Sequence, residues 1–320
     1  MSRYARQMIL PEVGPKGQQR LASARVLVIG AGGLAAPVLP LLAGAGVGHI
    51  TIVDGDTVDL SNLHRQTVFT EADCGQSKAQ VAAERCRALN SEIGVIWLEQ
   101  SLTSINSAAL VSDVDIVLDC ADSYAASYIL SDTCQTLKTP LVSASVLGMG
   151  GYVGGFCDTA PSLRAVFPDA PDSGASCATA GVLGPVVGVV GAMQAQMALA
   201  VLLGFDPSPL GQVVQFDART LRSTSFRFDG TPEPDHGFAF VAPGQLSAGD
   251  VIVDLRDTTE APTPAHPDAH RIAPGQVAEA LTPSNTRLAL CCASGLRAWR
   301  EAEQIHPLWP GEIVLVAASA

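Results

Sequence analysis

Residues 25–56 decide the fold of the first part of this chain and read RVLVIGAGGLAAPVLPLLAGAGVGHITIVDGD. The continuously apolar, β-branched run over 25–29 predicts a buried strand. Gly30, Gly32 and Gly33 follow it, where the chain needs a tight turn into a helix. The uncharged segment 34–45 predicts that helix, and residues 49–53 predict a second strand. The pattern predicts an α/β fold with a mostly parallel sheet.

The second strand leads into Asp54, about 20 residues past the glycine turn. In a Rossmann-like, doubly wound sheet an acid at this place accepts hydrogen bonds from ribose hydroxyls, and the phosphates lie at the helix N-terminus. The stretch therefore predicts a nucleotide site. A purely structural glycine turn or an ordinary dinucleotide site would show the same pattern.

The residues after the second strand favour a site that reacts on phosphate. Asn62, Arg65 and Lys78 bring an amide and two cations to the crevice expected there. A nicotinamide site has no need of them, whereas chemistry at phosphorus needs fixed cationic donors. The alternative is that they are solvated surface residues.

Further strands are expected at 94–98, 114–118, 140–145 and 151–157, and an antiparallel pair at 212–216 and 222–228 closes the domain. Asp119 and Asp122 follow the strand at 114–118. Either acid could hold Mg²⁺ beside nucleotide phosphates, or serve as a helix N-cap. Cys177 lies in a small-residue loop before a helix, where it is either a stabilised thiolate or an inert buried thiol.

Composition predicts two domains and a cytoplasmic protein. Pro and Gly cluster as a linker would, so the expected division is 1–230, a linker at 231–249, and 250–320. The formal net charge of −12 argues against nucleic acid or an anionic membrane as partner. Eight cysteines occur without a C-x-x-C pair, and the N-terminus lacks a signal-peptide apolar region.

The uncharged stretch 178–205 is long enough to cross a membrane. Pro185 and several glycines interrupt it, and Gln194 and Gln196 lie in its second half. No basic cluster flanks it. We therefore expect a buried helix, with a subunit interface as one role for it.

The second domain carries a cysteine in a defined setting. Residues 251–256 predict a strand that ends in an acid and an arginine, and 287–291 predict another that leads to Cys292. The sequence CASGLR at 292–297 then opens a helix to about 306, and 312–316 is a further strand. Backbone N–H groups around Cys292 would favour a thiolate or a persulfide. The alternative is an inert buried strand cysteine, as Cys291 is expected to be.

Six motifs in order resemble the ThiF/MoeB/HesA-type adenylyltransferases, which activate ubiquitin-like sulfur carriers and are related to the ubiquitin-activating enzymes. The resemblance runs from Arg3 to about Phe228. The motifs are RYARQ at 3–7, GAGG at 30–33, VDGD at 53–56, SNLHRQ at 61–66, GQSK at 75–78 and DCAD at 119–122. The second domain resembles rhodanese domains through its Asp-x-Arg strand end and Cys-x-x-Gly-x-Arg loop, although it is short.

The resemblance implies roles for these residues. ATP would be bound by Gly30, Gly32, Gly33, Asp54, Asp56, Asn62, Arg65, Gln66 and Lys78, with Mg²⁺ on Asp122. Arg6 would reach into the other subunit's site, since the family is usually homodimeric. Cys177 would align with a cysteine that some members link covalently to the carrier, and Cys292 would carry sulfur.

Three departures from the family pattern stand out. Ser162–Ala165 and the region near Pro234 replace the two C-x-x-C pairs of a structural zinc site, so no zinc is expected. Ser123 and Ser127 stand where the family has Asn and Arg, and Ala35 replaces the third glycine.

The expected reaction is ATP-dependent adenylation of the C-terminal glycine of a carrier that ends in Gly-Gly, followed by thiocarboxylation. A cysteine desulfurase would be the sulfur donor. The pathway is thiamine thiazole or molybdopterin formation, with a lean to thiamine. The alternatives are a nicotinamide-dependent oxidoreductase and a non-catalytic scaffold that binds the carrier.

Overall fold

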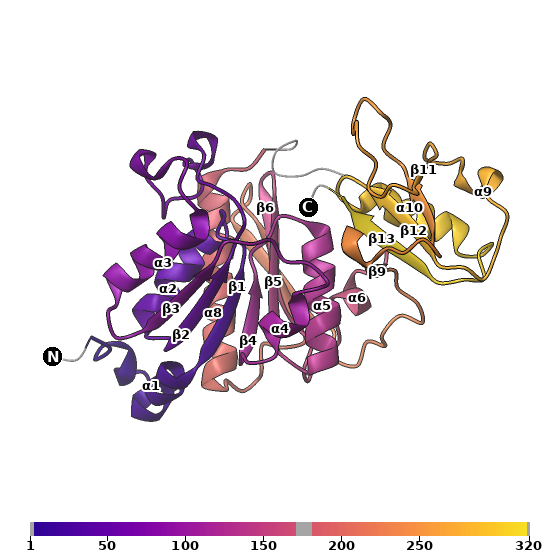
Figure 1. Cartoon of the computed structure of the whole chain (residues 1–320). Helices are drawn as coiled ribbons and strands as arrows, with labels where there is room; N and C mark the ends of the chain where they lie inside the picture. The colour runs from indigo at the N-terminus through magenta and orange to yellow at the C-terminus, as the bar shows by residue number, and fades with distance from the viewer. Residues whose placement is uncertain (1–2, 171–180, 319–320) are drawn as a thin grey trace.

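The structure is a computed structural model that describes residues 3–170 and 181–318. Two sheets organise it, one in each half of the chain (Figure 1). The larger has eight strands in the order β3-β2-β1-β4-β5-β6-β7-β8. The smaller has five strands in the order β11-β10-β12-β13-β9. The α/β class expected from the sequence is confirmed.

The larger sheet is parallel over β3, β2, β1, β4 and β5, and antiparallel from β5 to β8. The expected strands are all present, with ends shifted by one or two residues. Their bounds are β1 Arg25–Ile29, β2 His49–Val53, β3 Gly94–Leu98, β4 Ile116–Asp119, β5 Leu141–Leu147, β6 Gly150–Phe156, β7 Gln212–Asp217 and β8 Arg222–Arg227.

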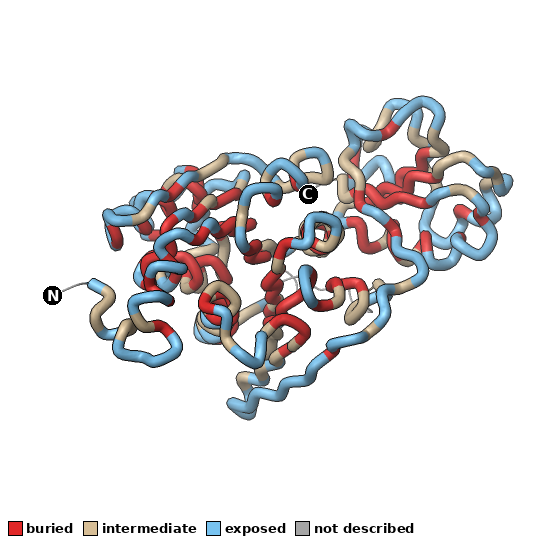
Figure 2. The backbone as a smooth tube through the Cα atoms, turned by 90° about the horizontal axis from the view of Figure 1, so that it is seen from below, coloured by how far each residue is buried: buried red, intermediate tan, exposed pale blue. Residues whose placement is uncertain are grey.

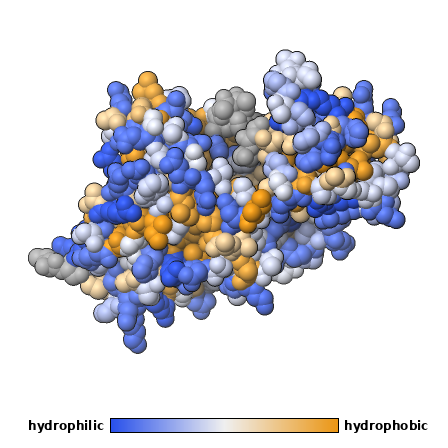
Figure 3. Space-filling model, viewed as in Figure 1, coloured by the Kyte–Doolittle hydropathy of each residue, from blue (hydrophilic) through white to orange (hydrophobic). Residues whose placement is uncertain are grey.

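Helices cover the two faces of this sheet unequally. One apolar core joins α1 (Gly14–Ser23), α2 (Ala35–Ala45), α3 (Lys78–Leu89) and α8 (Gly184–Leu203) to the sheet. The opposite face carries α4 (Ser107–Val111), α5 (Tyr124–Leu137) and α6 (Leu163–Val166). Apolar side chains gather over β2, β3 and α4 on the face seen in Figure 3. In β3 the side chain of Ile96 is 59% exposed.

The long apolar helix expected near 178–205 is α8, which begins at Gly184. By length and composition it is the one described helix that could span a membrane. In the molecule it packs against α2, β5 and β6, and most of the residues in its apolar window are buried. The expectation of a buried helix is therefore confirmed.

The smaller sheet is entirely parallel and buried on both faces (Figure 2). Its strands are β9 Ala239–Phe240, β10 Val251–Asp254, β11 His270–Arg271, β12 Leu288–Cys292 and β13 Ile313–Ala317, with helices α9 Val277–Ala280 and α10 Leu296–Ile305. The segment expected to be a linker supplies β9, which pairs with β13. That segment is thus partly built into the second sheet.

A single apolar core continues from the first sheet into the second half of the chain. At its centre the Trp299 ring of α10 stands edge-on to the Tyr128 ring of α5, with centroids 4.5 Å apart. The guanidinium carbon of Arg164 lies 4.9 Å from the centre of the same Tyr128 ring. Phe240 of β9 completes the cluster. The two sheets are therefore joined by packed aromatic side chains rather than by a free tether.

We predict that Trp299→Ala lowers the free energy of unfolding by about 3–5 kcal/mol, because truncating a buried aromatic residue leaves a cavity. Trp299 is only 2% exposed. Urea unfolding measures the loss. The matched control is Leu221→Ala, whose side chain is 79% exposed and should change stability by less than about 0.5 kcal/mol. Equal stabilities for the two variants would contradict the conclusion that packed aromatic side chains join the two sheets.

Candidate functional site

The candidate site lies at the carboxyl ends of β1, β2 and β4. After β1 the chain adds β2 and β3 on one side of it, and β4 then pairs on the other side. This change of direction is the switch point where open α/β sheets bind ligands. The glycine turn follows β1, Asp54 follows β2, and Asp119 ends β4.

Close packing at this edge requires Gly30. Its backbone has φ +89°, a left-handed conformation that favours glycine. Its N–H donates to the carbonyl oxygen of Val53 at 2.8 Å. A Cβ on Gly30 would lie 2.7 Å from the carbonyl oxygen of Cys120. The turn is therefore held between the ends of β2 and β4, with no room for a side chain.

Asp54 holds the glycine turn from the side of β2. Its carboxylate accepts hydrogen bonds from the backbone N–H groups of Ala31 at 2.6 Å and Asp56 at 2.7 Å. Burial raises the pKa of this carboxyl, while the two N–H donors oppose that rise. Each oxygen has a further lone pair, so a ribose hydroxyl can still donate to it. The expected ribose acid thus also shapes the phosphate turn.

Lys78 is buried beside the same turn. It is the first residue of α3, is 6% exposed, and its ammonium contacts the Asp56 carboxylate at 2.9 Å. Its backbone N–H also donates to the carbonyl oxygen of Asp56 at 3.0 Å. A buried ammonium needs an anionic partner. Asp56 supplies one here, and a phosphate that enters the site must share or replace it.

The loop at 60–66 brings the other expected residues to the glycines. A Cβ on Gly33 would lie 3.6 Å from Cγ of Arg65, and one on Gly32 would lie 3.6 Å from Nε2 of Gln66. Gln66 is 4% exposed, and its Oε1 is buried without a hydrogen-bond partner. Asn62 lies in the same loop and is half-buried. The structure therefore places the Arg65 side chain and the Gln66 amide next to the glycine turn.

The two acids after β4 have different surroundings. Asp119 is fully buried; its carboxylate accepts from the Ser143 hydroxyl at 2.7 Å and the Ala121 N–H at 3.2 Å, and burial raises its pKa. Asp122 is exposed just before α5. No side chain caps α5, so neither acid is its N-cap. Of the two candidate metal ligands, only Asp122 offers a free carboxylate surface to an ion.

Two of the expected residues are not brought to this edge, and a third cannot be placed. Arg6 is exposed, and its neighbour Gln7 donates to the carbonyl oxygen of Ala45 at 2.8 Å, at the far end of α2. An 11-residue helix is about 16 Å long, so Arg6 lies at the opposite end of the sheet from its own crevice. Cys177 lies outside the described residues. Cys292 ends β12 in the other sheet.

Sequence reasoning did not find the part played by Gln194. This residue is fully buried in α8, and its amide donates to the carbonyl oxygens of Asp119 at 2.7 Å and Val142 at 3.0 Å. The available signal was an amide inside an otherwise apolar helix. Such a residue needs buried hydrogen-bond partners, but the sequence alone did not say where they lie.

Comparison with known proteins gives the family of this site. The ThiF family model matches residues 4–237, which is more than half of the chain. The chain belongs to the ThiF family. Relatives include the sulfur carrier protein adenylyltransferase of Thermus thermophilus, 42% identical over 68% of this chain and 83% of that protein, and the sulfur carrier protein ThiS adenylyltransferase of Escherichia coli, 41% identical over 68% and 87%.

Other relatives are longer than this chain. An adenylyltransferase and sulfurtransferase MOCS3 from Culex quinquefasciatus is 43% identical over 71% of this chain and 52% of that protein. The chain thus spans about half the length of the first curated relatives it matches. Among solved structures, E. coli MccB with MccA-N7isoASN has a TM-score of 0.65 at 22% identity, covering 73% of this chain and 74% of that one, which shows a shared fold.

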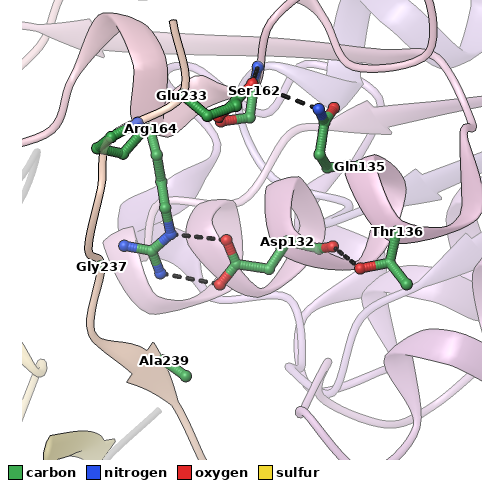
Figure 4. A pocket seen from close by; sticks show the side chains of 9 residues that line it. Asp132, Gln135, Thr136, Ser162, Arg164, Glu233, Gly237 and Ala239 are labelled. Carbon is green, nitrogen blue, oxygen red and sulfur yellow. Dashed lines mark hydrogen bonds and ion pairs between the residues drawn. The ribbon is translucent and has the colours of Figure 1, made fainter.

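In this ThiF-family chain, charged and polar side chains occupy the two segments that correspond to the C-x-x-C pairs of the family pattern (Figure 4). Arg164 of α6 forms two hydrogen bonds with the Asp132 carboxylate of α5, at 2.6 and 2.8 Å, and a third with the carbonyl oxygen of Phe238. Glu233 accepts from the Ser162 backbone and hydroxyl. A cavity of about 330 Å³ lies among these side chains. They tie 233–238 to α5 and α6, which pack on the first sheet, through an ion pair and hydrogen bonds.

Within residues 3–170 and 181–318, no group of three or more His, Cys, Asp or Glu side chains could hold a metal ion. Mg²⁺ in nucleotide sites commonly takes one or two carboxylates plus phosphate oxygens and waters. A single exposed carboxylate at Asp122 fits that mode of binding.

We predict that Gly30→Ala destabilises the fold by about 1–3 kcal/mol, because the left-handed backbone and the contact with the Cys120 carbonyl both oppose a Cβ. ATP should then raise the thermal unfolding temperature less than it does in the wild type. The control is Gly44→Ala in α2, where a Cβ meets nothing within 4 Å. That change should be neutral or stabilising by up to about 1 kcal/mol. Equal stabilities and equal effects of ATP in the two variants would refute the close approach of Gly30 to the Cys120 carbonyl.

Proposed function

We propose that this chain uses ATP to adenylate the C-terminal glycine of a ubiquitin-like sulfur-carrier protein. The observation that carries the proposal is the meeting of Arg65, Gln66 and Lys78 at the glycine turn, with the carboxylate of Asp54 beside it. A dinucleotide site needs ribose and pyrophosphate contacts only. A buried lysine and an arginine stacked over the turn suit charge that develops at phosphorus.

The reaction is a displacement at the α-phosphorus of ATP. A carboxylate oxygen of the carrier attacks that phosphorus, the bond to the bridging oxygen of the β-phosphate breaks, and pyrophosphate leaves. Lys78 exchanges Asp56 for phosphate oxygens as ATP binds, and Arg65 lies where it can neutralise charge on the same group. Asp54 accepts from the ribose, which fixes the nucleoside. Catalysis here is positioning and electrostatic stabilisation.

Bound Mg²⁺ would neutralise charge on the phosphate oxygens. Asp122 would hold it, because its carboxylate is exposed at the carboxyl end of β4 while Asp119 is engaged with Ser143.

The carrier itself is inferred from the family. The Thermus and E. coli relatives are named as adenylyltransferases of sulfur carriers, and the Culex relative as both adenylyltransferase and sulfurtransferase. We therefore propose a carrier that ends in Gly-Gly and serves thiamine thiazole or molybdopterin formation. Both carrier types belong in the assay.

Cys292 would supply the sulfur. Its Sγ accepts N–H hydrogen bonds from Gly295 at 3.1 Å and Ala298 at 3.4 Å, and the residue is fully buried, so its loop must open to meet a donor. In the proposed step a persulfide on Cys292 attacks the carbonyl carbon of the adenylate, a C–S bond forms and AMP leaves. A second thiol then attacks the Cys292 sulfur, which releases the thiocarboxylate and leaves a disulfide. Cys177 is a candidate for that thiol, and a cysteine desulfurase for the persulfide donor.

The placement of the second sheet supports this order of steps. Cys292 pairs in register with Ala317 of β13, and its side chain belongs to the same apolar core as Ala125 and Tyr128 of α5. Asp122 immediately precedes that helix. A flexible Gly-Gly tail gains about 3.5 Å of reach per residue, so short movements would carry the adenylate toward Cys292.

A homodimer would complete the site through Arg6. This exposed residue lies at the far end of its own sheet, so it can contribute to adenylation only in a second copy of the chain. The exposed apolar side chains over β2, β3 and α4 would be covered in such a dimer.

We predict that the purified protein catalyses carrier-dependent ATP–pyrophosphate exchange and that Lys78→Ala and Arg65→Ala each reduce it by at least about 10²-fold, since each removes a charge that stabilises the transition state. Isotope exchange with labelled pyrophosphate measures the rate. The control is Lys16→Ala, an exposed residue of α1, which should retain full exchange.

Two results would overturn adenylation. Exchange that is absent with every thiamine-type and molybdopterin-type carrier, together with tight nicotinamide binding in a fluorescence titration, would identify an oxidoreductase. Carrier binding that is unchanged in Arg65→Ala, with no adenylate formed by the wild type, would identify a scaffold.

We predict that Arg6→Ala and Arg65→Ala chains, each inactive alone, regain about a quarter of wild-type exchange when mixed and allowed to exchange subunits. In random dimers half are mixed, and each mixed dimer has one complete site if Arg6 acts across the interface. The parental variants incubated separately are the control. Activity that stays at the sum of the two parents would exclude this role of Arg6.

A further inference from the structure

Gln194 is the polar exception in the longest described helix. Helix α8 has twenty residues without a charge, and Gln194 is fully buried at its middle. An amide in such surroundings costs free energy unless its hydrogen-bonding groups find partners. Its exposed neighbour Gln196 carries no such requirement. The position of Gln194 therefore reflects what it binds.

Its amide is fully engaged at the ends of two strands. Nε2 donates to the carbonyl oxygens of Asp119 and Val142, at 2.7 and 3.0 Å, and the Cys120 thiol donates to Oε1 at 3.4 Å. Two carbonyl acceptors fix which amide atom is the nitrogen, because a carbonyl oxygen cannot donate. The Gln194 side chain thus ties Asp119, the last residue of β4, and the following Cys120 to α8 through hydrogen bonds.

The segment that Gln194 holds connects the two halves of the nucleotide site. The Cys120 carbonyl is the group that lies against Gly30, and the Cys120 N–H donates to the Ile29 carbonyl oxygen at 2.8 Å. Two residues further on stands Asp122. Asp119 is the last residue of β4, so beyond the hydrogen bond from the Cys120 N–H the strand ladder no longer constrains the backbone that leads to Asp122. Gln194 supplies the tether that the ladder lacks.

We propose that Gln194 is a positioning residue for adenylation: from α8 it sets the spacing between the glycine turn and Asp122. The inference rests on the proposed adenylation and adds a residue to it. The glycine turn would place the phosphates and Asp122 the magnesium, so a shift of the 119–121 backbone would misalign both. A misplacement of about 1 Å costs on the order of 10² in rate.

The test compares Gln194→Met with two controls in the full-length chain. Met has a similar length but cannot donate to the two carbonyls. Gln196→Met makes the same change at the exposed neighbour, and Val190→Ala truncates another buried side chain of α8 that is 1% exposed. We expect Gln194→Met to lower kcat for pyrophosphate exchange by about 10- to 100-fold. The KM for ATP should change much less, and half-maximal rate should need more Mg²⁺.

The controls separate positioning from stability. Val190→Ala should melt at a lower temperature yet keep its kcat in the folded fraction, and Gln196→Met should match the wild type. In an Asp122→Asn background Gln194→Met should cost less than it does alone, because both changes then act on one interaction. Wild-type kcat and Mg²⁺ dependence in folded Gln194→Met would overturn the inference, as would a loss equal to that of Val190→Ala.

Calorimetric binding of Mg²⁺ and ATP without carrier distinguishes this inference from the function it rests on. If the wild type binds ATP with Mg²⁺ but exchanges nothing, adenylation fails, while the Gln194 comparison is still decided by binding. A higher Mg²⁺ concentration for half-maximal metal binding to the ATP complex of Gln194→Met supports the positioning role. A Mg²⁺ requirement equal to that of the wild type refutes it.

Discussion

The close approach of Gly30 to the Cys120 carbonyl is the constraint on which the site depends. It forces the ends of β1 and β4 together at the switch point of the sheet, and it admits no side chain on the turn. Asp54 holds the turn from one side and Gln194 holds the Cys120 segment from the other. The starts of α2 and α5 follow from that contact, because the turn opens α2 and the Cys120 segment leads into α5.

Pairing with nearby groups shows how the site tolerates buried charge. Lys78 is paired with Asp56, and Arg65 lies over Gly33 with its Nη1 beside the His64 ring nitrogen. In a chain of net charge −12, the proposed phosphate binding would rely on such local cations rather than on the overall field. Asp56 supplies the buried Lys78 ammonium with an anionic partner. In the proposed reaction, phosphate oxygens would take the place of that partner.

The second half of the chain is joined to the first by side chains that a family pattern would not suggest. Arg164 links Asp132, the carbonyl of Phe238 and the ring of Tyr128, close to the positions that hold two cysteine pairs in the family pattern. A half-buried, bidentate ion pair fixes the relative orientation of its two side chains as well as attracting them. The Trp299 contact with Tyr128 adds the apolar part. Together they give the two sheets a continuous core without thiolate ligands.

The sequence by itself determined the strands, the glycine turn and the set of residues around it, because these depend on local periodicity and on residue types within short segments. It did not reveal the strand β9 within the expected linker, the burial of Asp119 against Ser143, or the contact between the Arg6 region and the far end of α2. It marked Gln194 as unusual without giving its partners. Those features depend on contacts between segments far apart in the chain: β9 pairs with β13, Gln7 binds the end of α2, and Gln194 of α8 binds the ends of β4 and β5. Only the folded structure brings these segments together.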